Sequence, residues 1–312
     1  MRKTVNKETI SGKVYDHNLA LKKVQNEKSD NFGKDFINGT LDIATDEAGL
    51  NVVTVHFTYV TPMTKAGAEN KTFTALKKII EGGKTVVADG IENATLVTVN
   101  TSIGLNDFYT DRDGEEKLVS SQRNDGGFVT IVNKLEDESK RNTFEFDILI
   151  NGTEYVEANE EKNIPADFLY VKGAVFNFAG KMLPIKLVVD SAGGMKYFES
   201  LDASSKNLVF TKVWGNIKSR TIVTKKEEEV AFGEPVVREY SRSIKEWVIT
   251  RAAKEAYEIG DAENGITTEE IQEKMATRET DLADVKKRQD EYRAAGGNAA
   301  ATPAVAAGSF NF

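Results

Sequence analysis

Asp35-Phe36-Ile37-Asn38-Gly39-Thr40-Leu41 and Val52-Val53-Thr54-Val55-His56-Phe57-Thr58-Tyr59-Val60, joined through a turn at Gly49, form the stretch of sequence that decides the fold. A similar stretch recurs later as Asp167-Phe168-Leu169-Tyr170-Val171-Lys172-Gly173, a turn at Gly180, and Leu183-Pro184-Ile185-Lys186-Leu187-Val188-Val189. The repeat predicts two copies of one small β-domain. Aromatic and lysine side chains on such strands suit a long, repetitive ligand better than a small substrate.

The composition is that of a globular protein with enough apolar residues for two cores. The chain has 312 residues, of which 40% are hydrophobic. No apolar run approaches the roughly 18 residues of a membrane span, and residues 1–8 lack the apolar stretch of a signal peptide. We therefore expect a cytoplasmic protein without a membrane partner. With no Cys and two His, disulfides, thiolate sites and most metal sites are disfavoured, so we expect no cofactor and no metal.

The net charge of −8 argues at first against a nucleic-acid ligand, but the charges are unevenly distributed. Residues 1–34 carry eight Lys and Arg against four Asp and Glu. Residues 205–220 carry Lys206, Lys212, Lys218 and Arg220 and no acidic residue. These stretches predict basic strips, although each can equally be read as a solvated face.

The apolar patterns predict the same order of elements in both copies. In the first copy, strands are expected over 12–24, 36–45, 52–60, 94–100 and 128–132, with a helix over 70–82. In the second copy, strands are expected over 143–150, 168–177, 183–189 and 209–217, with a helix over 195–201. The closing segment near 247–250 fits either a strand or a helix. This β-β-β-α-β-β order resembles the OB-fold, a five-stranded Greek-key barrel.

The predicted fold class is therefore mainly β with minor α. We expect two tandem OB-fold-like barrels over 8–135 and 143–255, a C-terminal helix over 266–294 and a flexible tail over 295–312. Thr267 and Glu270 form a capping box for the helix, whose thin apolar face is either peripheral or completed by a partner.

No arrangement of catalytic residues is recognisable, so we expect a protein that is not an enzyme. Gly83-Lys84-Thr85 could end a phosphate-binding loop, but Lys78 stands where that loop needs a glycine. A helix stop explains the glycines better. There is no Gly-x-Ser-x-Gly elbow.

Exposed aromatic residues next to cations are the candidate ligand-binding residues, because bases stack on aromatic rings while Lys and Arg neutralise phosphates. Trp214 is the strongest candidate, since Lys212, Lys218 and Arg220 share its alternation parity; the alternative is that Trp214 fills the barrel. The other candidates are Phe176, Phe178 and Lys172 in the second copy and Phe108, Tyr109 and Arg112 in the first. Five aromatic residues inside apolar strands are assigned to the core, namely Phe36, Phe57, Phe128, Phe168 and Trp247.

The run from Val97-Thr98-Val99-Asn100 through Phe108-Tyr109-Thr110-Asp111-Arg112-Asp113-Gly114 to Phe128-Val129 resembles part of single-stranded DNA-binding proteins, and the tandem arrangement resembles those of bacteriophages. The resemblance implies sequence-nonspecific binding of single-stranded DNA in phage DNA replication or recombination, within the cytoplasm of a bacterial host. It also implies recruitment of replication or recombination proteins through the tail, with Phe310 and Phe312 as contacts. The tail departs from the family pattern because no acidic residue follows Glu291. The alternative function is a structural or assembly protein, such as a phage virion component, that uses the barrels for protein contacts.

Overall fold

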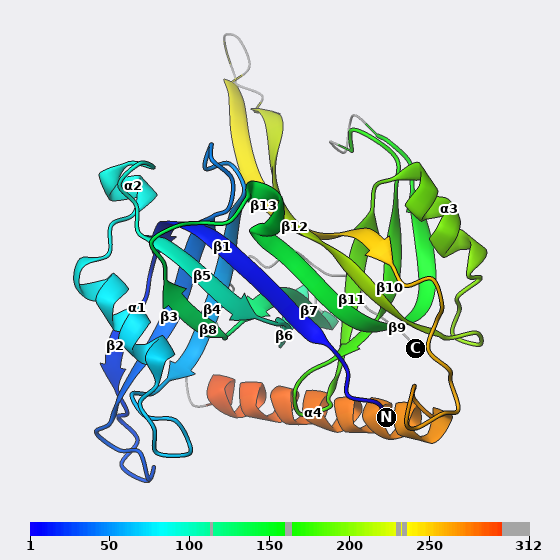
Figure 1. Ribbon diagram of the computed structural model, residues 1–312, viewed down its shortest axis with the longest axis horizontal. Coiled ribbons are helices and arrows are strands. Elements are labelled where there is room, and N and C mark those ends of the chain that lie inside the picture. Colours follow the sequence, from blue (N-terminus) through cyan, green and yellow to red (C-terminus); the bar gives the residue numbers. More distant parts are fainter. Residues whose placement is uncertain (113–114, 160–163, 229–231, 233–235, 295–312) are drawn as a thin grey trace.

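The structure is a computed structural model that describes residues 1–112, 115–159, 164–228, 232 and 236–294. The fold is mainly β, with two barrels side by side and one long helix beneath them (Figure 1). Over these described parts of the chain, no helix is long and apolar enough to cross a membrane.

The first barrel closes in the OB-fold order. Its antiparallel strands β1 (Asn6–His17), β3 (Asp35–Ala44) and β4 (Val52–Val60) follow one another, and β5 (Leu96–Thr101) returns to pair with β1. The fifth strand is split at Gly126 and Gly127. Its first part, the end of β7 (Glu115–Asp125), pairs in parallel with β4, and its second part, β8 (Phe128–Ile131), pairs with β5.

Four further elements are attached to the strands of this barrel. Helix α1 (Lys71–Gly82) lies between β4 and β5, as expected, and buries Phe73, Leu76 and Ile79. The short β2 (Ala20–Lys23) pairs with β3, and α2 (Val86–Asp89) follows α1. Strand β6 (Ile103–Arg112) pairs with β7 to form a long hairpin.

The second barrel repeats the order without the split. Strands β9 (Asn142–Val156), β10 (Phe168–Phe176) and β11 (Met182–Val189) are antiparallel neighbours, and α3 (Ala192–Ser200) follows β11. Strand β12 (Val209–Glu228) pairs with β9 and with β13 (Val236–Ala252), and Val188 of β11 meets Val248 of β13 in parallel. The segment near 247–250 is therefore a strand.

The sequence repeat corresponds to the second and third strands of each barrel. Gly49 turns the chain between β3 and β4 with φ of 72°, and Gly180 does the same between β10 and β11 with φ of 73°. Glycine adopts this left-handed conformation without the steric cost that other residues pay. The same glycine conformation therefore occurs at the corresponding turn of both barrels.

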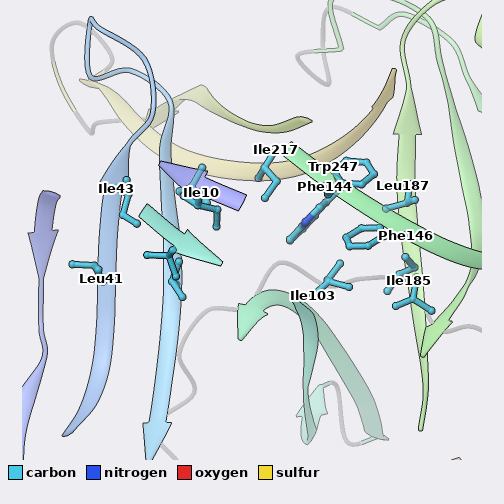
Figure 2. Close-up of a cluster of buried hydrophobic side chains, with 14 of the residues drawn as sticks. Ile10, Leu41, Ile43, Ile103, Phe144, Phe146, Ile185, Leu187, Ile217 and Trp247 are labelled. Carbon is cyan, nitrogen blue, oxygen red and sulfur yellow. The ribbon is translucent and has the colours of Figure 1, made fainter. Parts of the chain in front are cut away.

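The two barrels share a seam. Strand β1 pairs with β9 from Asn6 opposite Phe146 to Ile10 opposite Asn142, after the linker and its short 3₁₀ helix η1 (Glu138–Lys140). Behind this seam, inward side chains from both barrels pack together, among them Ile10, Phe144, Phe146, Ile217 and Trp247 (Figure 2). One continuous core therefore fixes the barrels to each other.

Helix α4 (Thr268–Ala294) lies across both barrels (Figure 1). Its apolar face is thin because apolar packing holds only part of the helix, whereas polar and charged contacts hold the rest. The predicted capping box is present: the Thr267 amide donates to Glu270 at 2.9 Å, and the Glu270 amide donates to the Thr267 hydroxyl at 3.2 Å. Ile271 packs into the second barrel near Phe176. Further along the helix, Arg278 contacts the first barrel through an ion pair and not through apolar packing. The thin apolar face of α4 is therefore covered by barrels of the same chain.

Removing the Arg278 guanidinium is expected to loosen this helix. Its two terminal nitrogens each lie 2.6 Å from a carboxylate oxygen of Asp107 on β6, and both side chains are largely buried. Arg278→Ala leaves Asp107 without this partner, so we expect a loss of about 1.5–3 kcal/mol in the free energy of unfolding. Guanidinium-induced unfolding of wild type and Arg278→Ala measures this loss. Arg288→Ala, which removes an exposed side chain bonded to its own helix, is the control. Equal stability of the two variants would contradict the bridging role.

Candidate functional site

Trp214 lies on the outer face of β12 at the seam between the barrels. Along this strand Val213, Gly215 and Ile217 are buried, whereas Lys212, Trp214 and Asn216 are half-buried and point outward. The structure thus answers the question left open by the sequence: Trp214 does not fill the barrel. Trp247 on β13, opposite Ile217, does, with 3% of its surface exposed.

Two cations flank the Trp214 ring. The Lys212 ammonium lies 5.8 Å and the Arg251 guanidinium 5.4 Å from the ring centroid. Arg251 stands directly opposite Trp214 on β13, and the exposed Thr250 is the extra residue of a bulge between Arg251 and Ile249. Bulges of this kind redirect the side chains next to them.

Gly215 is required for this arrangement. A Cβ at that position would meet the Val248 carbonyl oxygen at 2.0 Å and the Phe144 ring at 2.5 Å. The absence of a side chain lets β12 and β13 close over Phe144 while Trp214 stays on the outside. The core on one face therefore positions the aromatic ring on the other.

A cavity of about 270 Å³ opens beside Trp214. The lining comes from both barrels: Lys7 and Thr9 belong to β1, Thr143 and Glu145 to β9, and Ser139 to the linker. Lys7, Glu145, Trp214 and Arg251 are successive partners across four strands. A flat ring, two flanking cations and a polar floor thus meet in one concave place.

The charges of this site are only partly neutralised within the protein. Lys212 pairs with Glu145 at 2.6 Å and lies 3.9 Å from the buried Asp147. Lys7 and Arg251 are exposed at the two ends of the row. Such a row can attract phosphates while the ring stacks on a base.

The structure brings some predicted residues together and separates others. Lys212 and Trp214 meet as expected. Lys218 lies further along the same face, exposed, and pairs with Asp190 at 2.9 Å. Arg220 belongs to β12, but its side chain lies outside the described residues.

The two phenylalanines predicted near the Gly180 turn have opposite environments. Phe176 is 1% exposed and packs edge-on against Phe210, so its assignment to the ligand surface was wrong: its strand faces the core formed with α4. Phe178 is fully exposed at the turn. Lys172, on β10, pairs with Glu154 at 2.8 Å; it lies opposite Gly152 on β9, seven residues along that strand from Glu145, the partner of Trp214.

The predicted residues of the first copy lie near helix α4. Phe108 and Tyr109 are half-buried on β6. The Tyr109 amide donates to Gln289 at 2.8 Å, and the Gln289 amide donates back to the Tyr109 carbonyl at 2.5 Å. The Arg112 side chain and the tail residues Phe310 and Phe312 lie outside the described residues.

Sequence reasoning missed several residues of the site. Lys7, Glu145 and Arg251 reach the site through the β1–β9, β9–β12 and β12–β13 pairings, which no local sequence pattern predicts. Phe128 was assigned to the core and is 76% exposed. Phe36 is half-buried, whereas Phe57 and Phe168 are buried as expected.

A second concave surface lies on the first barrel, at the ends of β3 and β4. It has a volume of about 700 Å³ and is lined by Tyr59, Met63 and three lysines, Lys23, Lys34 and Lys65. The Tyr59 ring packs against Phe36 at 4.9 Å between centroids. Among the described residues, no group of three or more His, Asp or Glu could hold a metal ion.

The strand order and the seam define a mainly β protein built on OB-type barrels. Residues 6–288 match the YorF family, and the chain belongs to that family. No curated protein sequence matches the chain. Among solved structures, the single-stranded DNA binding protein from Thermus aquaticus is similar with a TM-score of 0.45 and 11% identity, over 85% of this chain and 98% of that one. A deletion variant of the Thermus aquaticus protein gives a TM-score of 0.44 and 13% identity, over 84% and 100%.

Proposed function

We propose that this protein binds single-stranded nucleic acid without sequence preference, with Trp214 as its stacking residue. The observation that carries the proposal is the half-exposed Trp214 ring between Lys212 and Arg251, beside a polar cavity. Every base has a π-face, so a ring with flanking cations binds any base and its phosphates. Single-stranded DNA is the ligand we expect, and no cofactor takes part.

Salt dependence of binding tests this function. A fluorescein-labelled thymidine oligonucleotide, followed by anisotropy, should bind the full chain at low salt with micromolar affinity or better. The logarithm of the binding constant should fall with the logarithm of salt concentration by about 0.7 per phosphate contact. No binding at micromolar protein and low salt would overturn the proposal.

We also propose that this binding serves DNA replication or recombination of a phage in the cytoplasm of its bacterial host. The support is the resemblance of the run from Val97 to Val129 to single-stranded DNA-binding proteins. Recruitment of replication or recombination proteins through Phe310 and Phe312 belongs to the same proposal. Deleting residues 295–312 should leave oligonucleotide affinity unchanged and abolish such recruitment.

A structural or assembly role is the second candidate. The net charge of −8 favours it, because an acidic surface repels phosphates. The thin apolar face of α4 does not favour it, since the helix is held by Asp107, Tyr109 and the second barrel. A stable complex with other proteins combined with failure to bind the oligonucleotide would favour this second candidate.

A further inference from the structure

A row of outward side chains crosses the seam from the first barrel to the Trp214 site. Phe128 on β8 stands opposite Asn100 on β5, which stands opposite Thr9 on β1. Thr9 in turn meets Thr143 on β9, and Thr143 meets Asn216 on β12. Figure 1 shows these strands in succession across the front of the molecule. The row is continuous because β1 and β9 pair.

The length of the row suits several nucleotides. Neighbouring strands lie about 4.8 Å apart, so four steps from Phe128 to Asn216 span about 19 Å. A strand with the spacing of duplex DNA, about 3.4 Å per phosphate, would place about five or six nucleotides over this distance. That figure falls within the range of roughly 4–16 nucleotides that single OB-folds cover.

The chemistry of the row is that of a stacking platform at each end with a polar floor between. Phe128 is 76% exposed, and its neighbour Asn100 is also exposed. The Thr9 hydroxyl donates to the Asn100 side-chain oxygen at 3.2 Å, so the floor is polar and uncharged there. Lys7 is exposed two residues before Thr9 on β1, and at the other end of the row Trp214, two residues before Asn216 on β12, lies beside Arg251. An aromatic end, a neutral floor and cations together complement a chain of bases and phosphates.

We propose that one nucleic-acid strand crosses both barrels along this row, with one base on Phe128 and another on Trp214. The proposal rests on the function proposed above and adds a second stacking residue and the path of the ligand. The nucleic-acid strand runs across the β-strands and over the seam. Both barrels bind the same nucleic-acid strand, and the shared core fixes the barrels relative to each other.

Oligonucleotide binding by single variants tests the path. Phe128→Ala should weaken binding of an oligonucleotide of about eight thymidines by about fivefold or more, as loss of one stacked base does. An oligonucleotide of about three thymidines, too short to reach from Trp214 to Phe128, should lose nothing. Tyr292→Ala, which removes a 59% exposed aromatic ring on α4, is the matched control. Phe128 is exposed, so an unchanged unfolding midpoint is expected and should be verified.

A gain of binding provides the second measurement. Asn100→Lys adds a cation in the middle of the row, so it should tighten binding and steepen the salt slope by about 0.7. Unchanged binding by both Phe128→Ala and Asn100→Lys, with Trp214→Ala still weakening it, would overturn the path and leave the proposed function standing. If the wild-type protein binds no oligonucleotide, both proposals fail together.

Discussion

Replacing Glu8 by Gln is expected to stabilise the protein above neutral pH and to remove a large part of its pH dependence. Glu8 is fully buried on the inward face of β1, directly opposite Phe144 on β9. One carboxyl oxygen accepts a hydrogen bond from the Trp247 indole at 2.7 Å, and the other has no partner among the described residues. Burial raises the pKa of Glu8 to about 8, and the Trp247 hydrogen bond opposes this in part.

The sign of the effect follows from which state holds the proton. Between the ordinary pKa near 4.5 and the folded value of about 8, the folded chain keeps the Glu8 proton and the unfolded chain has released it. The contribution of Glu8 to stability is therefore fully present below pH 4.5 and is lost as the pH rises through the folded value of about 8. A slope of about 1.4 kcal/mol per pH unit gives a total on the order of 5 kcal/mol.

Guanidinium unfolding at several values of pH from 5 to 8 measures this contribution. Other groups titrate equally in both proteins, so the difference between Glu8→Gln and wild type isolates Glu8. As the pH rises, the free energy of unfolding of Glu8→Gln should increase relative to that of wild type, because glutamine keeps an oxygen for Trp247 and never ionises. Glu27→Gln, in an exposed loop, should follow wild type. A constant difference over this range would show that Glu8 ionises normally.

Trp214→Ala is expected to weaken binding of single-stranded oligonucleotides by about 1–3 kcal/mol, or about 5- to 150-fold. The ring is half-buried on the outer face, held between Lys212 and Arg251, and contributes little to the barrel interior. The loss should therefore occur in affinity with little change in unfolding midpoint. Trp214→Phe should recover a large part of the affinity because it keeps a flat ring.

Anisotropy titrations of wild type, both Trp214 variants and Tyr292→Ala test this expectation. Tyr292→Ala should bind as wild type does. Equal affinity in all four proteins would place the ligand elsewhere, and the lysine-lined surface around Tyr59 is the alternative position. Loss of folding in Trp214→Ala but not in Trp214→Phe would show a structural role for the ring.

The order of elements could be predicted from the sequence because alternation and turn residues are local. Gly49, Gly180 and the capping box at Thr267 each indicated their element correctly. The arms of β12 and β13 beyond the barrel were missed. Apolar alternation reports burial, whereas these arms project past the core and are held by pairing along the hairpin (Figure 1).

The candidate site could be predicted only in part, since it depends on contacts between distant residues. Alternation on one strand placed Lys212 and Trp214 correctly on one face. Lys7 and Arg251 join them only through the β1–β9 and β12–β13 pairings. Phe128 was misassigned because Phe128-Val129-Thr130-Ile131 is almost uniformly apolar and gives no parity; the structure buries Val129 and exposes Phe128.

Tryptophan fluorescence during titration with single-stranded DNA tests the central claim most directly. The chain has two tryptophans, and Trp247 is buried behind the seam, so a stacked base should quench Trp214. The proposal predicts saturable quenching of wild type by a thymidine oligonucleotide at low salt, reversal of the quenching by added salt, and its loss in Trp214→Phe. Binding without quenching, or quenching that persists in Trp214→Phe, would contradict a nucleic-acid site at Trp214.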